Sequence, residues 1–295
     1  MYDVIIIGAG PAGITAGIYC QRANLKTIIF EKESIGGQIA SSPLVENFPG
    51  CKSISGAQLA QNFYEQADEL GIPIEIEEVT KIEPGEIIKV TTDFGEYETK
   101  TLIVATGSKH RLLGLPNEVE LIGKGIAFCT SCDGAFFKGK DIAVIGGGNT
   151  AVTNALYMAN LCNKVYLVNK GDKLICEKTL EDKLNSLPNV EIISDASVKE
   201  ILGTDELEGI VLTNDRKLDI KGMFISIGMN AQTDVVKDLL KLNEYNYVDS
   251  DDCATNKNNI FVAGDCRNKS IRQLTTAVAD GTTAAVKVIK YLEEK

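Results

Sequence analysis

Two cysteines separated by two residues, Cys129 and Cys132, are the residues of this chain best suited to do chemistry, and Asp133 follows them directly. A Cys-x-x-Cys pair favours a redox dithiol, because its spacing leaves the sulfurs close enough to close a small disulfide ring. The thiolate of such a pair can have a depressed pKa and act as a nucleophile. The carboxyl group of Asp133 could carry protons to and from it. We therefore predict that these three residues are catalytic.

Two other interpretations of the cysteine pair remain open. Half of a zinc site would need two further ligands, since structural zinc is held by four. The sequence has no second Cys-x-x-Cys motif and a single histidine, His110, which we expect to be solvated. We therefore expect no metal site. The other alternative is a pair of buried, inert cysteines.

A complete dinucleotide-binding pattern opens the chain. An apolar run predicts a buried strand at 3–7, a helical pattern follows a glycine-rich loop to about residue 23, and a strand at 26–30 leads into an acidic residue. In this arrangement glycines let the backbone approach a pyrophosphate at a helix N-terminus, and the acid accepts hydrogen bonds from a ribose. The residues expected to hold a dinucleotide here are Gly8, Gly10, Pro11, Ala12, Gly13 and Glu31.

The same pattern recurs about 138 residues later and predicts an internal repeat of the fold. A strand at 141–145 leads into a second glycine-rich loop at 146–151, a helix follows, and the next strand lies at 164–168. Alanine in the third position of this loop is allowed by the same close helix packing. The possible contacts to a nicotinamide dinucleotide are Gly146, Gly148, Asn149 and Thr150.

The C-terminal stretch returns to the first domain. A buried strand at 260–265 ends in Gly264-Asp265, and a helix runs from about 273 to 292. Such a strand needs a sheet, and the first domain supplies one. The sequence therefore predicts an α/β fold of two Rossmann-like dinucleotide-binding domains, each with the three-layer ββα architecture. The second domain is inserted into the first. The expected domains are 1–113 with 230–295, and 114–229.

Composition excludes several classes of protein. The 295 residues are 44% hydrophobic and 24% charged, as in ordinary globular proteins, and no apolar run reaches the roughly 18 residues of a membrane span. The net charge of −11 disfavours binding to nucleic acid or to anionic membranes. The N-terminus shows no export signal, so we expect a cytoplasmic protein whose eight cysteines do not form a structural disulfide framework.

Together these motifs closely resemble the low-molecular-weight thioredoxin reductases over essentially the whole chain. The resemblance implies FAD in the first domain and electron transfer through Cys129 and Cys132 to the disulfide of thioredoxin, with Asp133 as acid and base. It also implies a homodimer and a rotation of the domains about hinges near 113–116 and 228–230. Beyond the first loop and its acid, the FAD contacts that it implies are Gly37, Gln38, Asn47, Gly264, Asp265, Arg272 and Gln273.

The chain departs from this family where the 2′-phosphate of NADPH would bind. The family has His-Arg-Arg and a further Arg there, and a Glu pair in the preceding helix. Losing two charge-assisted hydrogen bonds would remove roughly 3–6 kcal/mol, or about 10² to 10⁴ in affinity. NADH is no obvious replacement, since an NAD site favours an acid at this strand end. The matching residues here are Asn169, Lys170, Gly171 and Ile175, with Thr153 and Asn154 in the helix.

The electron donor is therefore open between NADPH and reduced ferredoxin, because a ferredoxin-dependent branch of this family lacks the same motifs. Two other functions are also open. One is a flavoprotein ferredoxin/NAD(P) oxidoreductase, which would not need the dithiol, and the other is a non-catalytic FAD-binding protein. The remaining cysteines have no predicted role: Cys20 and Cys162 are expected in the core, and Cys51, Cys176, Cys253 and Cys266 in or near loops.

Overall fold

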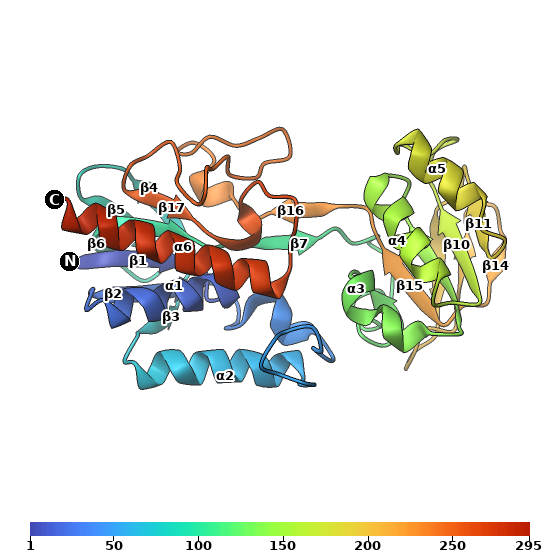
Figure 1. Cartoon of the computed structure of the whole chain (residues 1–295), viewed down its shortest axis with the longest axis horizontal. Coiled ribbons are helices and arrows are strands. Elements are labelled where there is room, and N and C mark those ends of the chain that lie inside the picture. The colour runs from blue at the N-terminus through green and yellow to red at the C-terminus, as the bar shows by residue number, and fades with distance from the viewer. The chain divides into compact units, whose positions relative to one another are not determined.

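The computed structural model describes residues 1–295 and confirms the predicted α/β class (Figure 1). The chain divides into unit 1, residues 1–109 with 230–295, and unit 2, residues 110–229. The chain first passes from unit 1 to unit 2 between residues 109 and 110, whereas the sequence predicts this boundary after residue 113. Strand β7 (Ser108–His110) explains the difference, because it carries the chain out of unit 1 and pairs with β16 (Met229–Ala231), which carries it back.

Unit 1 is built on a seven-stranded sheet with the order β3-β2-β1-β6-β5-β4, and β17 pairs with the second half of β6. Strands β3, β2, β1, β6 and β17 run parallel, and β4, β5 and the first half of β6 form an antiparallel meander. The parallel strands are apolar and buried, as expected for strands covered on both faces. Their bounds are β1 Tyr2–Ile7, β2 Thr27–Glu31, β3 Ile74–Ile76, β4 Val79–Glu83, β5 Ile88–Thr92, β6 Glu96–Val104 and β17 Ile260–Val262.

Three helices belong to unit 1: α1 (Pro11–Arg22), α2 (Gly56–Glu69) and α6 (Leu274–Glu293). Helices α1 and α6 lie side by side over the sheet, although more than 250 residues separate them in the chain (Figure 1). Their backbones approach closely at Gly281, where a Cβ would lie 2.2 Å from the carbonyl oxygen of Ala12. This contact brings the C-terminal helix onto the helix that follows the first glycine loop.

Unit 2 repeats the parallel arrangement in a five-stranded sheet with the order β11-β10-β9-β15-β8. Helix α4 (Asn149–Ala159) packs its apolar side on one face of the sheet, and the antiparallel strands β12, β13 and β14 share a core with the other. The short helices are α3 (Thr130–Asp133) and α5 (Lys178–Asn185). The strands are β8 Ile126–Ala127, β9 Asp141–Ile145, β10 Lys164–Val168, β11 Val190–Ile193, β12 Val198–Leu202, β13 Gly209–Leu212, β14 Lys217–Leu218 and β15 Gly222–Ile225.

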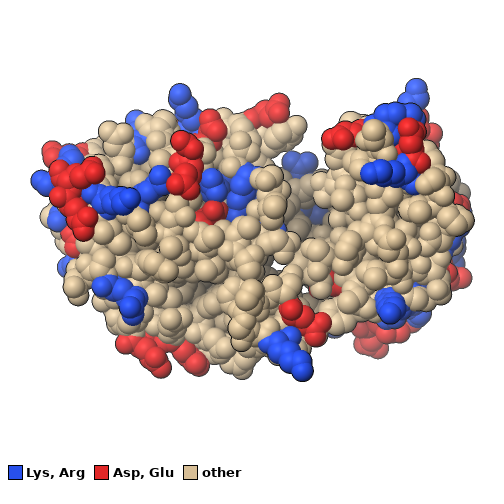
Figure 2. Space-filling view, in the orientation of Figure 1, with Lys and Arg blue, Asp and Glu red and all other residues tan.

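The surface carries charges of both signs. On the face that Figure 2 shows, acidic and basic side chains lie near one another, with uncharged surface between the groups. The net charge of −11 therefore coexists with local basic positions. None of the helices is long and apolar enough to cross a membrane.

Replacing Gly281 by alanine tests the contact between α1 and α6. Alanine has the higher helix propensity by about 1 kcal/mol, which alone would stabilise the helix. The new Cβ would overlap the carbonyl oxygen of Ala12, so we expect a net loss of about 1–3 kcal/mol in the free energy of unfolding. Chemical denaturation of the apoprotein measures this, with Val286→Ala on the exposed side of α6 as the control. A variant as stable as the wild type would contradict the packing described here.

Candidate active site

The two cysteines of the predicted redox pair are joined in a disulfide. The S–S distance is 2.06 Å and the Cα atoms lie 5.2 Å apart. Helix α3 begins immediately after Cys129, and the backbone N–H groups of Cys132 and Asp133 donate to the Cys129 carbonyl oxygen at 3.3 and 3.0 Å. This single turn brings the sulfurs together, so the chemistry of the pair depends on a structure of only a few residues.

Asp133 lies half-buried directly after Cys132. Burial raises the pKa of its carboxyl group to about 6, because the charged form loses hydration. A carboxyl group with this pKa is partly protonated near neutral pH. It can therefore take up or release a proton beside a thiol–disulfide exchange.

His110 is half-buried, whereas the sequence analysis expects a solvated side chain. Its ring stacks on that of Phe128, with the centroids 4.3 Å apart and the planes inclined by 12°. Burial lowers the pKa of His110 to about 4, so the imidazole is neutral at physiological pH. Phe128 directly precedes Cys129, and no local pattern of residues indicates this contact.

The first glycine loop joins β1 to α1 and leaves one position open. Gly10 lies in extended backbone at the helix N-cap, and no atom would lie within 4 Å of a Cβ built on it. Gly13 has no such room, since its Cβ would lie 1.8 Å from the Gly8 carbonyl oxygen. The backbone N–H of Ala9 donates to Glu31 Oε2 at 2.8 Å, which brings the predicted acid to the loop. The opening at Gly10 is where the close approach of a pyrophosphate would occur.

Two buried polar atoms at the neighbouring strand ends have no hydrogen-bond partner. They are Thr106 Oγ1, just after β6, and Asp265 Oδ1, just after β17. Strand β6 pairs with both β1 and β17, so these atoms lie at the same edge of the sheet as the glycine loop. Buried polar groups are normally satisfied. A ligand that carries hydroxyl groups on a chain leading from a pyrophosphate, as FAD does, fits this donor and acceptor set.

Asp265 is surrounded by a group of buried charged side chains, and the sequence did not indicate this group. The ammonium of Lys269 lies 3.4 Å from Asp265 Oδ1 and 2.9 Å from Asp280 Oδ2, and its side chain is only 9% exposed. Arg267 pairs with the other oxygen of Asp280 at 2.9 Å. Burial raises the pKa of Asp265, and the charge of Lys269 opposes this shift. No local pattern could have found Asp280, which lies in the middle of α6.

The other predicted FAD contacts come from loops around the same unit. Gln38 lies in the short helix Gly37–Ser41 and donates to the Ser108 carbonyl oxygen. Arg272 lies with its guanidinium carbon 4.0 Å from the centre of the Tyr247 ring. Gln273 caps the N-terminus of α6.

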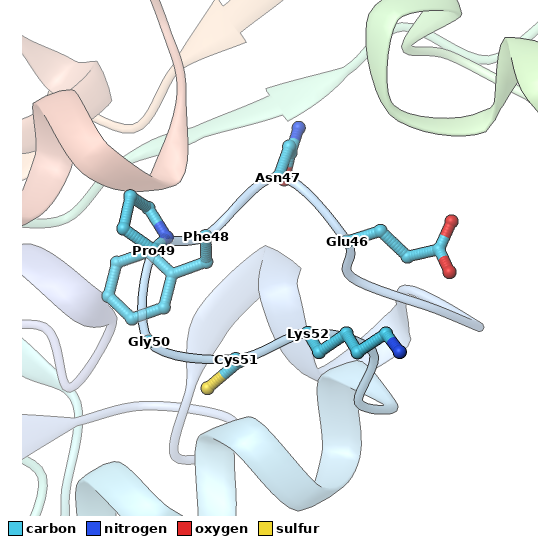
Figure 3. Close-up of a pocket in the computed structure, with 7 residues that line it drawn as sticks. All are labelled: Glu46, Asn47, Phe48, Pro49, Gly50, Cys51 and Lys52. Carbon is cyan, nitrogen blue, oxygen red and sulfur yellow. The ribbon is translucent and has the colours of Figure 1, made fainter.

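Asn47 lies in the loop 46–52, which lines an open pocket of about 560 Å³ (Figure 3). Figure 3 shows the side chains of Glu46 and Lys52 at one side of this loop and Phe48 beside Pro49 at the other. The ring of Phe48 packs edge-on against Phe63 of α2, with centroids 6.0 Å apart. This contact holds the loop that carries Asn47 against the helix.

The second glycine loop engages its own chain. Asn169, at the end of β10, is 6% exposed, and its amide donates to the carbonyl oxygens of Gly171 and Lys173 at 3.0 and 2.8 Å. The N–H of Ile175 donates to the Gly147 carbonyl oxygen at 2.8 Å. The side-chain oxygen of Asn149, at the start of α4, accepts from the Glu177 N–H at 2.8 Å. The segment after β10 thus lies against the loop through neutral groups.

Comparisons with known proteins agree with this geometry. Residues 2–281 match the family model described as pyridine nucleotide-disulphide oxidoreductase. A thioredoxin reductase of Bacillus subtilis is 38% identical, over 100% of this chain and 96% of its own length. The chain belongs to the thioredoxin reductase family. A 34.2 kDa protein in the rubredoxin operon of Clostridium pasteurianum is 43% identical, over 99% of this chain and 98% of its own.

Solved structures lead to the same family. The crystal structure of thioredoxin reductase from Streptococcus pyogenes superposes with a TM-score of 0.95 at 40% identity, over 100% of this chain and 99% of that one. Membership of the pyridine nucleotide-disulphide oxidoreductases implies FAD and a pyridine nucleotide as cofactors. The open Gly10 and the two buried polar atoms of unit 1 that make no hydrogen bond fit FAD.

The raised pKa of Asp133 makes a prediction about stability. Its folded pKa of about 6 exceeds the ordinary value of 3.8, so the folded protein binds more protons between these values. Stability therefore falls as pH rises from about 4 through 6. Asp133→Asn removes this penalty, and we expect a gain of about 1–2 kcal/mol at pH 7 and none near pH 4. The full shift would be worth about 3 kcal/mol, but a half-exposed carboxyl group keeps part of its hydration.

Denaturation of the oxidised protein as a function of pH measures this gain. Asp205→Asn, at an exposed acid, serves as the control. A gain that is the same at pH 4 and pH 7 would show that burial of the Asp133 charge is not its cause.

The two glycines of the first loop should respond differently to alanine. The new methyl group of Gly10→Ala meets no neighbouring atom, so we expect only the cost of replacing an N-cap glycine by alanine, about 0.5–1 kcal/mol in the free energy of unfolding of the apoprotein. Its methyl group would stand where a pyrophosphate must approach, so FAD affinity should fall at least about tenfold. Gly13→Ala should lose about 3 kcal/mol or fail to fold. Titration of the apoprotein with FAD, followed by flavin fluorescence, measures this affinity. An unchanged FAD affinity in Gly10→Ala would contradict the assignment of this loop to the pyrophosphate.

Proposed function

We propose that this protein reduces the disulfide of a thioredoxin through the dithiol of Cys129 and Cys132. The observation that carries the proposal is the disulfide between these residues, closed by one helical turn and followed by a carboxyl group with a pKa of about 6. Full-length relatives named thioredoxin reductase support it. The Cys-x-x-Cys ring is the only disulfide of the chain, and the six other cysteines are free thiols.

The exchange balances within the side chains of the two proteins. One cysteine of the reduced pair, as a thiolate, attacks a sulfur of the thioredoxin disulfide, and the second thioredoxin sulfur leaves and takes up a proton. The other cysteine then attacks the mixed disulfide, releases the first thioredoxin sulfur and restores the bond between Cys129 and Cys132. Two electrons and two protons pass to thioredoxin. Asp133 can exchange the protons, since its pKa is near the working pH.

FAD, when bound, supplies the two-electron carrier that reduces the disulfide. The first glycine loop would hold its pyrophosphate at the N-terminus of α1. Glu31 would accept hydrogen bonds from the ribose, and Thr106 and Asp265 would meet polar groups of the linking chain. The proposed further contacts are Gly37, Gln38, Asn47, Gly264, Arg272 and Gln273.

We propose that reduced ferredoxin, and not NADPH, is the electron donor. Two ferredoxins would each give one electron for every disulfide reduced. Asn169 carries no charge and its amide hydrogens already bind the backbone of its own loop, so it offers nothing to a 2′-phosphate. Ile175 is 85% exposed and apolar where a cation would serve that phosphate.

NADPH is the second candidate donor, and a specific observation favours it. Gly146 and Gly148 keep the geometry of a dinucleotide loop, with Gly148 as the N-cap of α4 and a φ of 140° at Gly146. Asn149 and Thr150 begin the helix whose N-terminus would face a pyrophosphate. Only Lys170 supplies a positive charge among the positions that would bind the 2′-phosphate. A flavoprotein ferredoxin/NAD(P) oxidoreductase is disfavoured, because that reaction leaves the dithiol without a use.

The proposal also covers the cellular location and the oligomeric state. We propose a cytoplasmic homodimer, by analogy with the family. The structure brings together no group of three or more His, Cys, Asp or Glu side chains that could hold a metal ion.

Single serine variants of the cysteine pair test the proposed reaction. Cys129→Ser and Cys132→Ser each remove one of the two sulfurs that the exchange requires, so thioredoxin reduction should fall to the background rate. FAD should remain bound, since neither residue belongs to unit 1. Cys176→Ser, at a partly exposed thiol outside the pair, is the control. Full turnover in either variant of the pair would show that the dithiol does not carry the electrons.

A new cation at position 175 tests the proposed donor. Ile175→Arg places a guanidinium on an exposed side chain, so folding should be unaffected. One charge-assisted hydrogen bond is worth about 1.5–3 kcal/mol, and we expect the Kd for NADPH to fall about tenfold at this exposed site. The Kd for NADH, which lacks the phosphate, should not change, and Ile175→Met controls for side-chain length. Wild-type protein that already binds NADPH far more tightly than NADH would contradict the proposal.

A further inference from the structure

A chain of hydrogen bonds ties the cysteine ring to the helix that follows the second glycine loop. The hydroxyl of Thr130 donates to Asn154 Oδ1 at 2.8 Å, and the Asn154 amide donates to Ser226 Oγ at 2.9 Å. Thr130 is the residue after Cys129 and is 5% exposed. The three side chains come from α3, from α4 and from the end of β15. Asn154 thus connects the redox turn, the glycine-loop helix and the sheet.

The redox turn depends on such anchors. Helix α3 has four residues, which is far too short to be stable by itself. Besides the disulfide, the turn is held by the hydrogen bonds that the backbone N–H groups of Cys132 and Asp133 donate to the Cys129 carbonyl oxygen. On its other side, Gly134 packs so closely that a Cβ would lie 2.9 Å from the sulfur of Met158 on α4. A buried hydroxyl without a partner costs about 1–3 kcal/mol, so the bond from Thr130 to Asn154 is strongly favoured.

We infer that Asn154 is a positioning residue for the redox dithiol. By anchoring Thr130 it holds the two cysteines at the Cα separation of 5.2 Å that the ring requires, and so favours the disulfide over the open dithiol. Two thiols on a loosely held turn meet less often, which lowers their effective concentration and weakens the disulfide. The inference rests on the proposed redox role of Cys129 and Cys132, and it is independent of which donor reduces the flavin.

The amide of Asn154 suits this position because it accepts and donates at once. Its oxygen receives the Thr130 hydroxyl, and its nitrogen supplies a hydrogen to Ser226. Ser226 lies against Gly146, where a Cβ would be 2.5 Å from the Ser226 carbonyl oxygen. The second glycine loop, through α4, therefore also supports the redox site.

The equilibrium between disulfide and dithiol tests the inference. The oxidised holoprotein is equilibrated anaerobically in dithiothreitol redox buffers, and the state of the peptide with Cys129 and Cys132 is measured by differential alkylation and mass spectrometry. We expect Asn154→Ala and Thr130→Val each to shift the exchange constant toward the dithiol about two- to tenfold. This range follows from the net value of one hydrogen bond and corresponds to about 9–30 mV.

A double-variant cycle separates this role from general destabilisation. The double variant of Asn154→Ala and Thr130→Val should shift the constant no more than the larger single change, because both remove the same bond. Thr130→Ser, which keeps the hydroxyl, should retain the wild-type constant. Asn160→Ala is the matched control, since Asn160 lies at the end of α4 and its exposed amide bonds to the Leu156 carbonyl oxygen at 2.9 Å.

The exchange constants of the variants decide whether Asn154 positions the dithiol. Wild-type constants in both single variants, or additive shifts in the double variant, would overturn the role of Asn154. If Asn154→Ala does not fold, Thr130→Val decides, because valine has nearly the shape of threonine. A wild-type pair that cannot be reduced reversibly would overturn the proposed redox function itself, and the role of Asn154 with it.

Discussion

The close packing of a glycine-loop helix against its parallel sheet is the constraint on which both units depend. In unit 1 a Cβ on Gly13 would lie 1.8 Å from the Gly8 carbonyl oxygen, and in unit 2 a Cβ on Gly146 would lie 2.5 Å from that of Ser226. Neither contact leaves room for a side chain, so the loop, the helix N-terminus and the neighbouring strand ends have fixed positions. The residues that do chemistry are placed by backbone that cannot shift without losing this packing.

The two copies of this arrangement have been put to different uses. The loop of unit 1 is open at Gly10, and Thr106 Oγ1 and Asp265 Oδ1, which make no hydrogen bond, lie at the adjoining strand ends. In unit 2 the side chain of Asn169 binds the backbone of its own loop, and Asn154 binds Thr130 of the redox turn. The first copy therefore fits a cofactor, and the second lies beside the dithiol, which we propose it positions.

The sequence was sufficient where a feature is local. The strands and helices around each glycine loop follow from hydrophobic periodicity, and Cys129 and Cys132 are close in space because they are close in the chain. Contacts between distant segments could not be predicted, because they depend on how elements pack. The bond from Thr130 to Asn154, the pair of Lys269 with Asp280, and the burial of His110 are of this kind. The predicted FAD contacts and the role of Asp133 stay predictions.

We propose that electrons reach a thioredoxin disulfide through this dithiol from a donor other than NADPH. The most direct measurement is anaerobic bleaching of the visible flavin absorbance of the holoprotein by reduced ferredoxin, NADPH or NADH, with oxidised thioredoxin added afterwards. We expect rapid bleaching by reduced ferredoxin, slow bleaching by either nucleotide, and recovery of the absorbance as thioredoxin is reduced. Rapid bleaching by NADPH would contradict it and would show that Lys170 and its neighbours form a working phosphate site.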